Sequence, residues 1–104
     1  MPSHLILTTA PSHSEARKIA RALVEKKLAA CVNIVPKVES IYRWQGKVET
    51  AQEWMLVIKT SQKRAKAVEE TIKELHSYDL PECISVVIDG GTKEYLQWLS
   101  DQVK

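Results

Sequence analysis

Runs of apolar and β-branched residues divide the chain into four predicted strands. Two short runs, 5–9 and 84–88, are rich in the β-branched residues that strands favour. Two much longer runs cover about 30–44 and 48–60, and Pro36 marks a bulge or an edge position within the first. Gln45-Gly46 separates the long runs, and because glycine readily adopts positive φ values, it predicts a tight hairpin turn.

Between these strands, apolar residues recur every three to four positions, which predicts helices. Ser12, Ser61 and Thr92 precede three such segments and are expected to cap them, with Glu15 placed three residues after Ser12 as in a capping box. The expected apolar residues are Ile19, Ala20, Leu23 and Val24 in the first helix, Ala65, Val68, Ile72 and Leu75 in the second, and Tyr95, Leu96, Leu99 and Val103 in the last.

The predicted order is βαββαβ followed by one more helix. Two helical crossovers and one direct hairpin are typical of an α+β ferredoxin-like sandwich, in which helices cover one face of the sheet. We therefore expect a single domain over 1–104, with an extra C-terminal helix and a long central hairpin.

The long hairpin carries more apolar surface than one small domain can cover. Residues 54–58 are apolar at every position, whereas two helices can shield only one face of a sheet. Large exposed apolar patches usually mark interfaces. The pattern therefore predicts an oligomer in which hairpin edges pair between protomers.

Composition narrows the function classes. The chain has 104 residues, a net charge of +2, and two cysteines, which we expect to be reduced thiols rather than a disulfide framework. The small charge gives no reason to expect nucleic-acid binding. The N-terminus lacks the pattern of a signal peptide, and no apolar run approaches the ~18 residues of a membrane span. A cytoplasmic protein without membrane contact is the expectation.

The motifs of other proteins that share this predicted fold are missing from the sequence. An RNA-recognition module stacks bases on aromatic residues, commonly Phe or Tyr, of its central strands, whereas this chain contains no Phe and its first strand has no aromatic residue. The loop at 8–12 has neither the arginine nor the glycine expected of an acylphosphatase. Gly-rich phosphate loops, zinc-protease helices and Ser/His/Asp arrangements are also missing, so we do not expect an enzyme.

Several motifs, in order along nearly the whole chain, resemble those of the CutA divalent-cation-tolerance family. They lie at 28–33 (Leu-Ala-Ala-Cys-Val-Asn), 42–47 (Tyr-Arg-Trp-Gln-Gly-Lys), 59–60, 76–82 and 95–99. The resemblance implies a homotrimer of ferredoxin-like subunits, built like PII-type signalling proteins, that associates with copper and other divalent metals. It implies no catalytic activity.

The resemblance also identifies Cys31 and His76 as candidate metal ligands. Thiolate and imidazole both suit copper. Two positions depart from the family pattern: Thr8 replaces the cysteine of some relatives, and Ser77 replaces the proline usual after the histidine. Alternatively, Cys31 is a small buried apolar residue that begins a strand, and His76 is a capping residue at the C-terminus of a helix, where a cation is favoured.

A second set of residues suggests a small-ligand cleft between subunits. Trp44, Lys59, Tyr78 and Glu82 would combine an aromatic wall with a few polar groups if a hairpin tip approached the 78–82 loop of a neighbour. The alternative is an interface in which Trp44 is an anchor and Lys59 pairs with Glu82.

Three functions remain open. The first is a trimeric copper- or divalent-cation-binding protein that contributes to metal tolerance, with Cys31 and His76 as ligands. The second is a PII-like trimeric sensor that binds a small molecule or anion between subunits. The third is a structural trimer that acts through protein partners.

Overall fold

A computed structural model describes residues 2–104 and confirms the predicted order of elements. They are β1 (Ser3–Ala10), α1 (His13–Glu25), β2 (Cys31–Trp44), β3 (Lys47–Ser61), α2 (Gln62–Leu75), β4 (Ile84–Ile88) and α3 (Lys93–Gln102). The strands form one antiparallel sheet in the order β2-β3-β1-β4, as the ferredoxin-like prediction requires. No helix in this part of the chain is long and apolar enough to cross a membrane.

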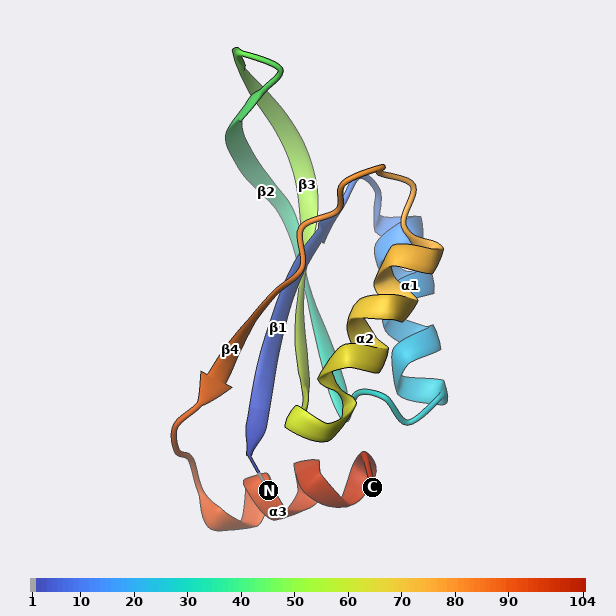
Figure 1. Cartoon of the computed structure of the whole chain (residues 1–104), viewed down its shortest axis with the longest axis vertical. Coiled ribbons are helices and arrows are strands. Elements are labelled where there is room, and N and C mark those ends of the chain that lie inside the picture. The colour runs from blue at the N-terminus through green and yellow to red at the C-terminus, as the bar shows by residue number, and fades with distance from the viewer. Residues whose placement is uncertain (1) are drawn as a thin grey trace.

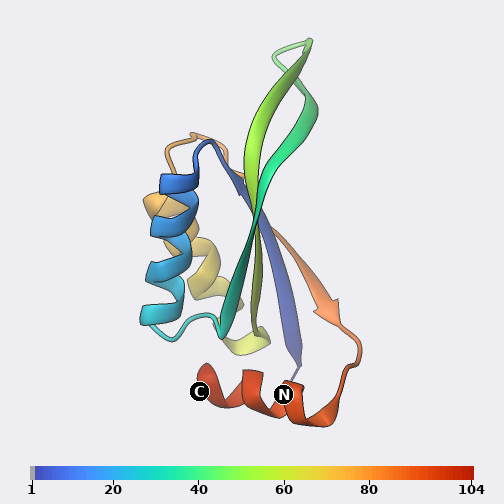
Figure 2. The same ribbon diagram turned by 180° about the vertical axis from the view of Figure 1, so that it is seen from behind.

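The helices cover one face and one end of the sheet (Figure 1). Helices α1 and α2 lie together on the same face, and α3 runs across the end of the sheet near both termini. Figure 2, seen from behind, also shows α1 and α2 on one side of the strands, and no helix of the described residues lies against the other side. We call this uncovered side the open face.

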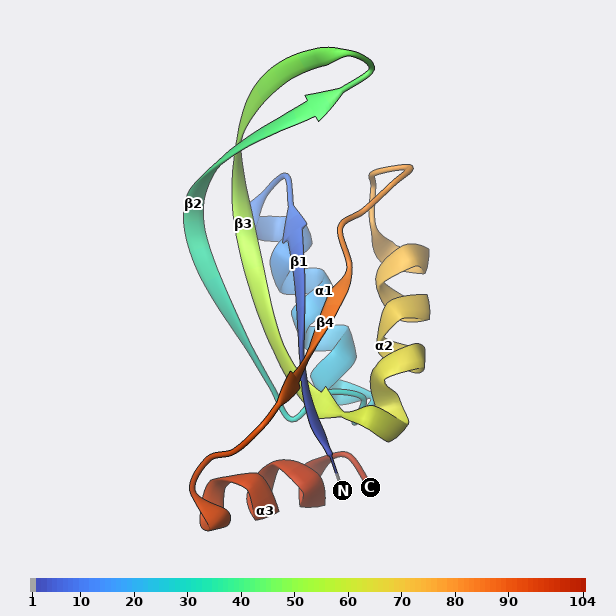
Figure 3. The ribbon, with the colours of Figure 1, turned by 60° about the vertical axis from the view of Figure 1, so that its left-hand side comes forward.

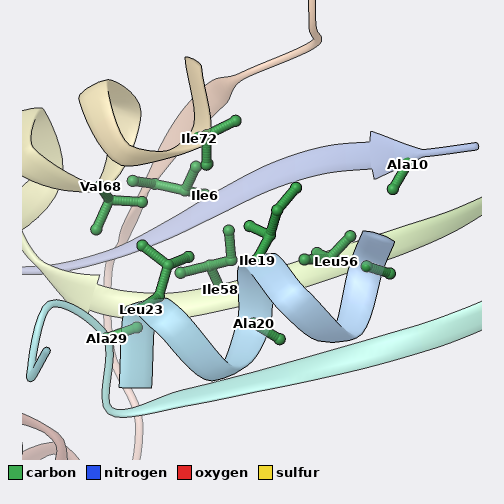
Figure 4. Packing of buried hydrophobic residues seen from close by; sticks show 11 residues of the cluster. Ile6, Ala10, Ile19, Ala20, Leu23, Ala29, Leu56, Ile58, Val68 and Ile72 are labelled. Atoms are coloured by element: carbon green, nitrogen blue, oxygen red, sulfur yellow. The ribbon is translucent and has the colours of Figure 1, made fainter. Parts of the chain in front are cut away.

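The core fills the space between the sheet and the helices α1 and α2 (Figure 4). Its fully buried members include Ile6, Leu56 and Ile58 from the sheet and Ile19, Leu23, Val68 and Ile72 from the helices. Val24 was expected in the apolar stripe of α1 but is 42% exposed. Adjacent helical residues point about 100° apart, so Leu23 takes the inward position and Val24 faces water.

The helix caps agree only in part with the sequence prediction. Ser12 caps α1 by accepting a hydrogen bond from the Glu15 amide at 3.1 Å. Ser61 and Thr92 occupy N-cap positions, but their side chains make no capping hydrogen bond. At the start of α2, the Gln62 amide instead donates to the backbone oxygen of Pro2 at 3.0 Å. The chain before β1 therefore satisfies the first amide of α2, whereas an N-cap side chain accepts from the second or third amide of a helix.

The hairpin β2-β3 extends well beyond the rest of the sheet (Figure 1). Its turn has positive φ at Gln45 (49°) and Gly46 (81°), as two-residue hairpin turns require. The pairing register shifts between Val35 and Val38, which confirms the predicted bulge at Pro36. Positive φ at Lys37 accompanies this bulge.

The open face carries the surplus of apolar residues predicted for this chain. Cross-strand pairs place Leu5 and Leu7 of β1 on the same side as Val57 of β3 and Val86 of β4. These side chains remain partly or largely exposed, and Val86 is 52% exposed. Both faces of β3 are therefore apolar, although only one is covered within the chain.

Candidate functional site

A cavity of about 720 Å³ lies between the outer half of the hairpin and the loop that follows α2. Figure 3 shows the outer hairpin bending over the end of the sheet from which this loop runs into β4. We call the cavity the hairpin cleft. The residues that matter most for its chemistry are Tyr42, Trp44, Glu49, Glu53, Tyr78 and Glu82.

The pairing of the hairpin explains why these residues meet on one surface. Tyr42 lies opposite Glu49, and Trp44 lies opposite Lys47 across the turn. Because side chains alternate along a strand, the even positions of outer β2 and the odd positions of β3 share one face. Glu53 lies further along this face, so the hairpin presents aromatic rings and carboxylates together.

Tyr78 joins the loop to the hairpin through a single hydrogen bond. Its hydroxyl donates to Oε2 of Glu53 at 2.9 Å. Burial raises the pKa of Tyr78 above its usual value. The hydrogen bond to Glu53 and the negative charge of Glu53 raise that pKa further. The phenol therefore remains protonated and acts as a donor to a carboxylate that is only 6% exposed.

The cleft is acidic. Asp79 joins Glu49, Glu53 and Glu82 along its walls, and within residues 2–104 no ion pair involves any of the four. Burial and the charge of Glu53 raise the pKa of Glu82. Such uncompensated negative charge favours cationic ligands and disfavours the anion considered from the sequence.

His76 lies behind the cleft, with a side chain that is fully buried. Its Nε2 is 2.6 Å from the backbone oxygen of Thr9, and its Nδ1 accepts a hydrogen bond from the Tyr78 amide at 3.1 Å. Oε2 of Glu15 lies 3.3 Å from the same Nδ1 and also accepts hydrogen bonds from the amide and hydroxyl of Ser77. Both ring nitrogens thus have protein partners, and a metal would have to displace one of them.

Cys31 and His76 occupy different ends of the sheet. Cys31 pairs with Lys59, whereas the Thr9 contact of His76 lies opposite Met55, four residues away along β3. This offset corresponds to about 13 Å at ~3.3 Å per residue, which is too far for two ligands of one metal within a chain. Throughout the described residues, no three His, Cys, Asp or Glu side chains gather as a metal site.

The second predicted set of residues is divided in the same way. Trp44, Tyr78 and Glu82 all line the hairpin cleft of a single chain. Lys59 instead lies with its Nζ 5.6 Å from the ring centre of Tyr95 in α3. Within one chain, Lys59 therefore lies away from Glu82, whereas the predicted ion pair joins two subunits and stays a prediction.

Sequence reasoning did not identify Tyr42, Glu49, Glu53 or Asp79 as candidate site residues. For the hairpin residues, a signal was available, because the Gln45-Gly46 turn fixes the register and thereby places Tyr42 opposite Glu49. Asp79 offers no comparable signal, since its position depends on how an irregular loop folds over the sheet.

The fold and the cleft together define a small ferredoxin-like protein whose extended hairpin forms one wall of a cavity. A family model described as "CutA1 divalent ion tolerance protein" matches residues 4–102. The chain belongs to this family, as the resemblance of its motifs predicted.

Named relatives and solved structures agree with this assignment. The chain is 50% identical over 97 residues to the divalent-cation tolerance protein CutA of Thermus thermophilus, covering 93% of this chain and 94% of that protein. The crystal structure of CutA1 from Oryza sativa gives a TM-score of 0.97 at 42% identity, over 100% of this chain and 95% of that one. The Thermus thermophilus structure gives 0.95 at 47% identity, over 98% and 99% of the two chains.

The chain spans somewhat more than half the length of its plant relatives. It is 42% identical over 104 residues to a chloroplastic CutA protein of Arabidopsis thaliana, and it covers 57% of that protein. The similar CutA of Archaeoglobus fulgidus is instead described as a periplasmic divalent cation tolerance protein. Members of the family are therefore assigned to different compartments, and the family alone does not identify one for this chain.

Proposed function

We propose that the chain assembles as a homotrimer through its open faces and hairpins. The apolar open face supports this assembly, because Leu7, Val57 and Val86 would be buried by a neighbouring subunit. The two edge strands of the sheet, β2 and β4, are free to pair with other chains. Light scattering should give a mass near three times the 11.8 kDa chain. A monomeric mass at micromolar concentration would refute the assembly.

A substitution on the open face would test the proposed interface. Val57→Lys places a charge among apolar side chains that would be buried in a trimer, so we expect a smaller species. Lys66→Glu on the exposed side of α2 is the control, since it also changes charge but lies away from the open face. Equal masses for both variants would place the interface elsewhere.

The trimer's proposed role is to bind divalent cations, copper among them, in a response to metal ions. Membership of the divalent ion tolerance family is the observation that supports this proposal. Cys31 is a free, partly exposed thiol of the kind that binds copper. Because one chain gathers no complete ligand set among its described residues, we expect ligands from more than one subunit.

Competitive titration of the reduced protein with Cu(I) and Cu(II) tests this role. Cys31→Ala should abolish tight binding at a fixed stoichiometry per trimer, and Cys83→Ala provides the matched control. His76→Ala tests the second proposed ligand, provided that the trimer and its thermal stability are checked in the same sample. Weak binding that none of the substitutions changes would reduce copper to an incidental ligand.

The hairpin cleft favours a second candidate function, that of a PII-like sensor for a small molecule. Its volume of about 720 Å³ falls within the ~300–1,000 Å³ range of small-ligand sites. In either role the protein would be a cytoplasmic binding protein rather than an enzyme. A structural trimer that acts only through protein partners would respond neither to metal nor to small ligands.

A further inference from the structure

Glu53 has an unusual environment for a carboxylate. It is only 6% exposed, and the one hydrogen-bond donor found for it among residues 2–104 is the neutral hydroxyl of Tyr78. No lysine, arginine or histidine of the described chain forms an ion pair with it. Buried charges in proteins are normally paired, so Glu53 favours a cation as a further partner.

The surroundings of Glu53 determine what kind of cation would fit. Tyr42, Trp44 and Tyr78 line the same cavity, and each side chain is between 36% and 43% exposed. Aromatic faces attract ammonium and guanidinium groups, and they also pack against methylene chains. The walls therefore suit a cation that has a hydrocarbon portion.

The arrangement of the carboxylates disfavours a bare metal ion. Glu49, Glu53, Asp79 and Glu82 line one cavity, but no three of them gather closely enough to share an ion. A metal needs several ligand atoms at about 2–2.6 Å, whereas separated carboxylates can each meet a different charged group. The spacing therefore fits a ligand that carries several separated positive charges.

We propose that the hairpin cleft binds a small aliphatic di- or polyamine. One ammonium group would pair with Glu53, another would pair with Glu82 in the same cavity, and the methylene chain would pack against Trp44 and Tyr42. This inference rests on the second candidate function, a small-molecule sensor, and is independent of copper binding at Cys31. It assigns the ligand to a cationic class and excludes anions from the cleft.

Calorimetric titration of spermidine into the full chain, in its native assembly, tests the proposal. Glu82→Gln and Glu53→Gln should each weaken binding roughly tenfold, as expected for the loss of a charge-assisted hydrogen bond. Glu70→Gln, which removes one exposed carboxylate from α2, is the matched control and should leave affinity unchanged. Glu53→Gln alters a buried group. If that variant does not fold, Glu82→Gln alone tests the proposal.

A second comparison changes the ligand instead of the protein. Octane-1,8-diol has a similar hydrocarbon chain without charge, so it should not bind measurably at the concentrations used for spermidine. Equal affinities for Glu82→Gln and Glu70→Gln, or no spermidine binding at millimolar concentration, would overturn the proposal. Cys31→Ala should retain spermidine binding whatever the copper result. A failure of the copper proposal can therefore be told apart from a failure of the polyamine proposal.

A neighbouring subunit is the other source from which a cation could reach Glu53. The exposed Arg43 near the hairpin tip hydrogen-bonds to Gly46 of its own turn, and in an assembly it could enter the cleft of another copy. In that case spermidine would bind only after Arg43→Gln, and that result would also overturn the proposal for the native protein.

Discussion

Replacing Tyr78 with phenylalanine tests the link between the loop and the hairpin. The substitution removes one hydroxyl and leaves Glu53, which is 6% exposed, without its donor. Hydrogen bonds to charged groups contribute about 1.5–3 kcal/mol, and Tyr78 is 36% exposed, so water can partly replace the lost partner. We therefore expect Tyr78→Phe to lower the free energy of unfolding by about 1–2 kcal/mol.

Urea denaturation at one fixed protein concentration measures this loss, because the stability of an assembled protein depends on concentration. Glu53→Gln and the double variant complete a double-mutant cycle. If the two side chains interact as the 2.9 Å contact indicates, their coupling energy should exceed about 0.5 kcal/mol.

Tyr95→Phe is the matched control for this cycle. It removes a hydroxyl from a tyrosine of similar exposure (42%) at the other end of the molecule, and we expect a change within about 0.5 kcal/mol. Equal effects of Tyr78→Phe and Tyr95→Phe, together with zero coupling to Glu53, would refute the view that this hydrogen bond holds the cleft together.

Three further predictions concern pH, thiol reactivity and the core. The raised pKa of Glu82 means that the folded state binds the carboxyl proton more tightly than the unfolded state does. The contribution of Glu82 to the free energy of unfolding therefore falls as pH rises from about 4.5 through the raised pKa. Urea midpoints between pH 4 and 7 should show this fall in the native protein relative to Glu82→Gln, and parallel curves would contradict it. Burial and two nearby glutamates raise the pKa of Cys83, so its thiol in a Cys31→Ser variant should react with disulfide reagents more slowly than free cysteine at pH 7.5; a rate equal to that of free cysteine would count against this. Leu56→Ala removes a fully buried side chain and should cost about 2–5 kcal/mol in the same urea assay, and a cost below about 1 kcal/mol would contradict the packing.

The architecture could be predicted from sequence because local signals and hydrophobic periodicity agree. Gln45-Gly46 requires positive φ, Pro36 interrupts the β2-β3 pairing, and the apolar spacing of α1 and α2 places their residues against the sheet. The caps were less predictable. A serine before a helix signals a start, but whether its hydroxyl turns toward a free amide depends on its surroundings: Ser12 caps α1 in this way, whereas Ser61 does not cap α2.

The site was harder to predict because it depends on contacts between distant segments. Tyr78 and Glu53 are 25 residues apart, and only the folding of the loop over the hairpin brings them together. Family motifs identified Trp44, Tyr78 and Glu82 individually, but motifs carry no distances. Within one chain, Lys59 lies beside Tyr95 and not at the cleft, and Cys31 and His76 lie at different ends of the sheet. Whether a neighbouring subunit brings these residues together stays a prediction.

The proposed assembly surface and the proposed ligand cleft are continuous along β3. Glu53 alternates in phase with Met55 and Val57, so all three side chains project from the same face of the strand, the first into the cleft and the others onto the open face. A subunit packed on the open face would therefore border the cleft. A ligand that binds the assembled cleft more tightly than the free chain stabilises the trimer by the same free energy with which trimerisation strengthens binding. Measuring the dissociation constant of the trimer with and without spermidine therefore gives the coupling free energy between assembly and ligand binding. This one quantity tests both the proposed trimer and the proposed polyamine cleft.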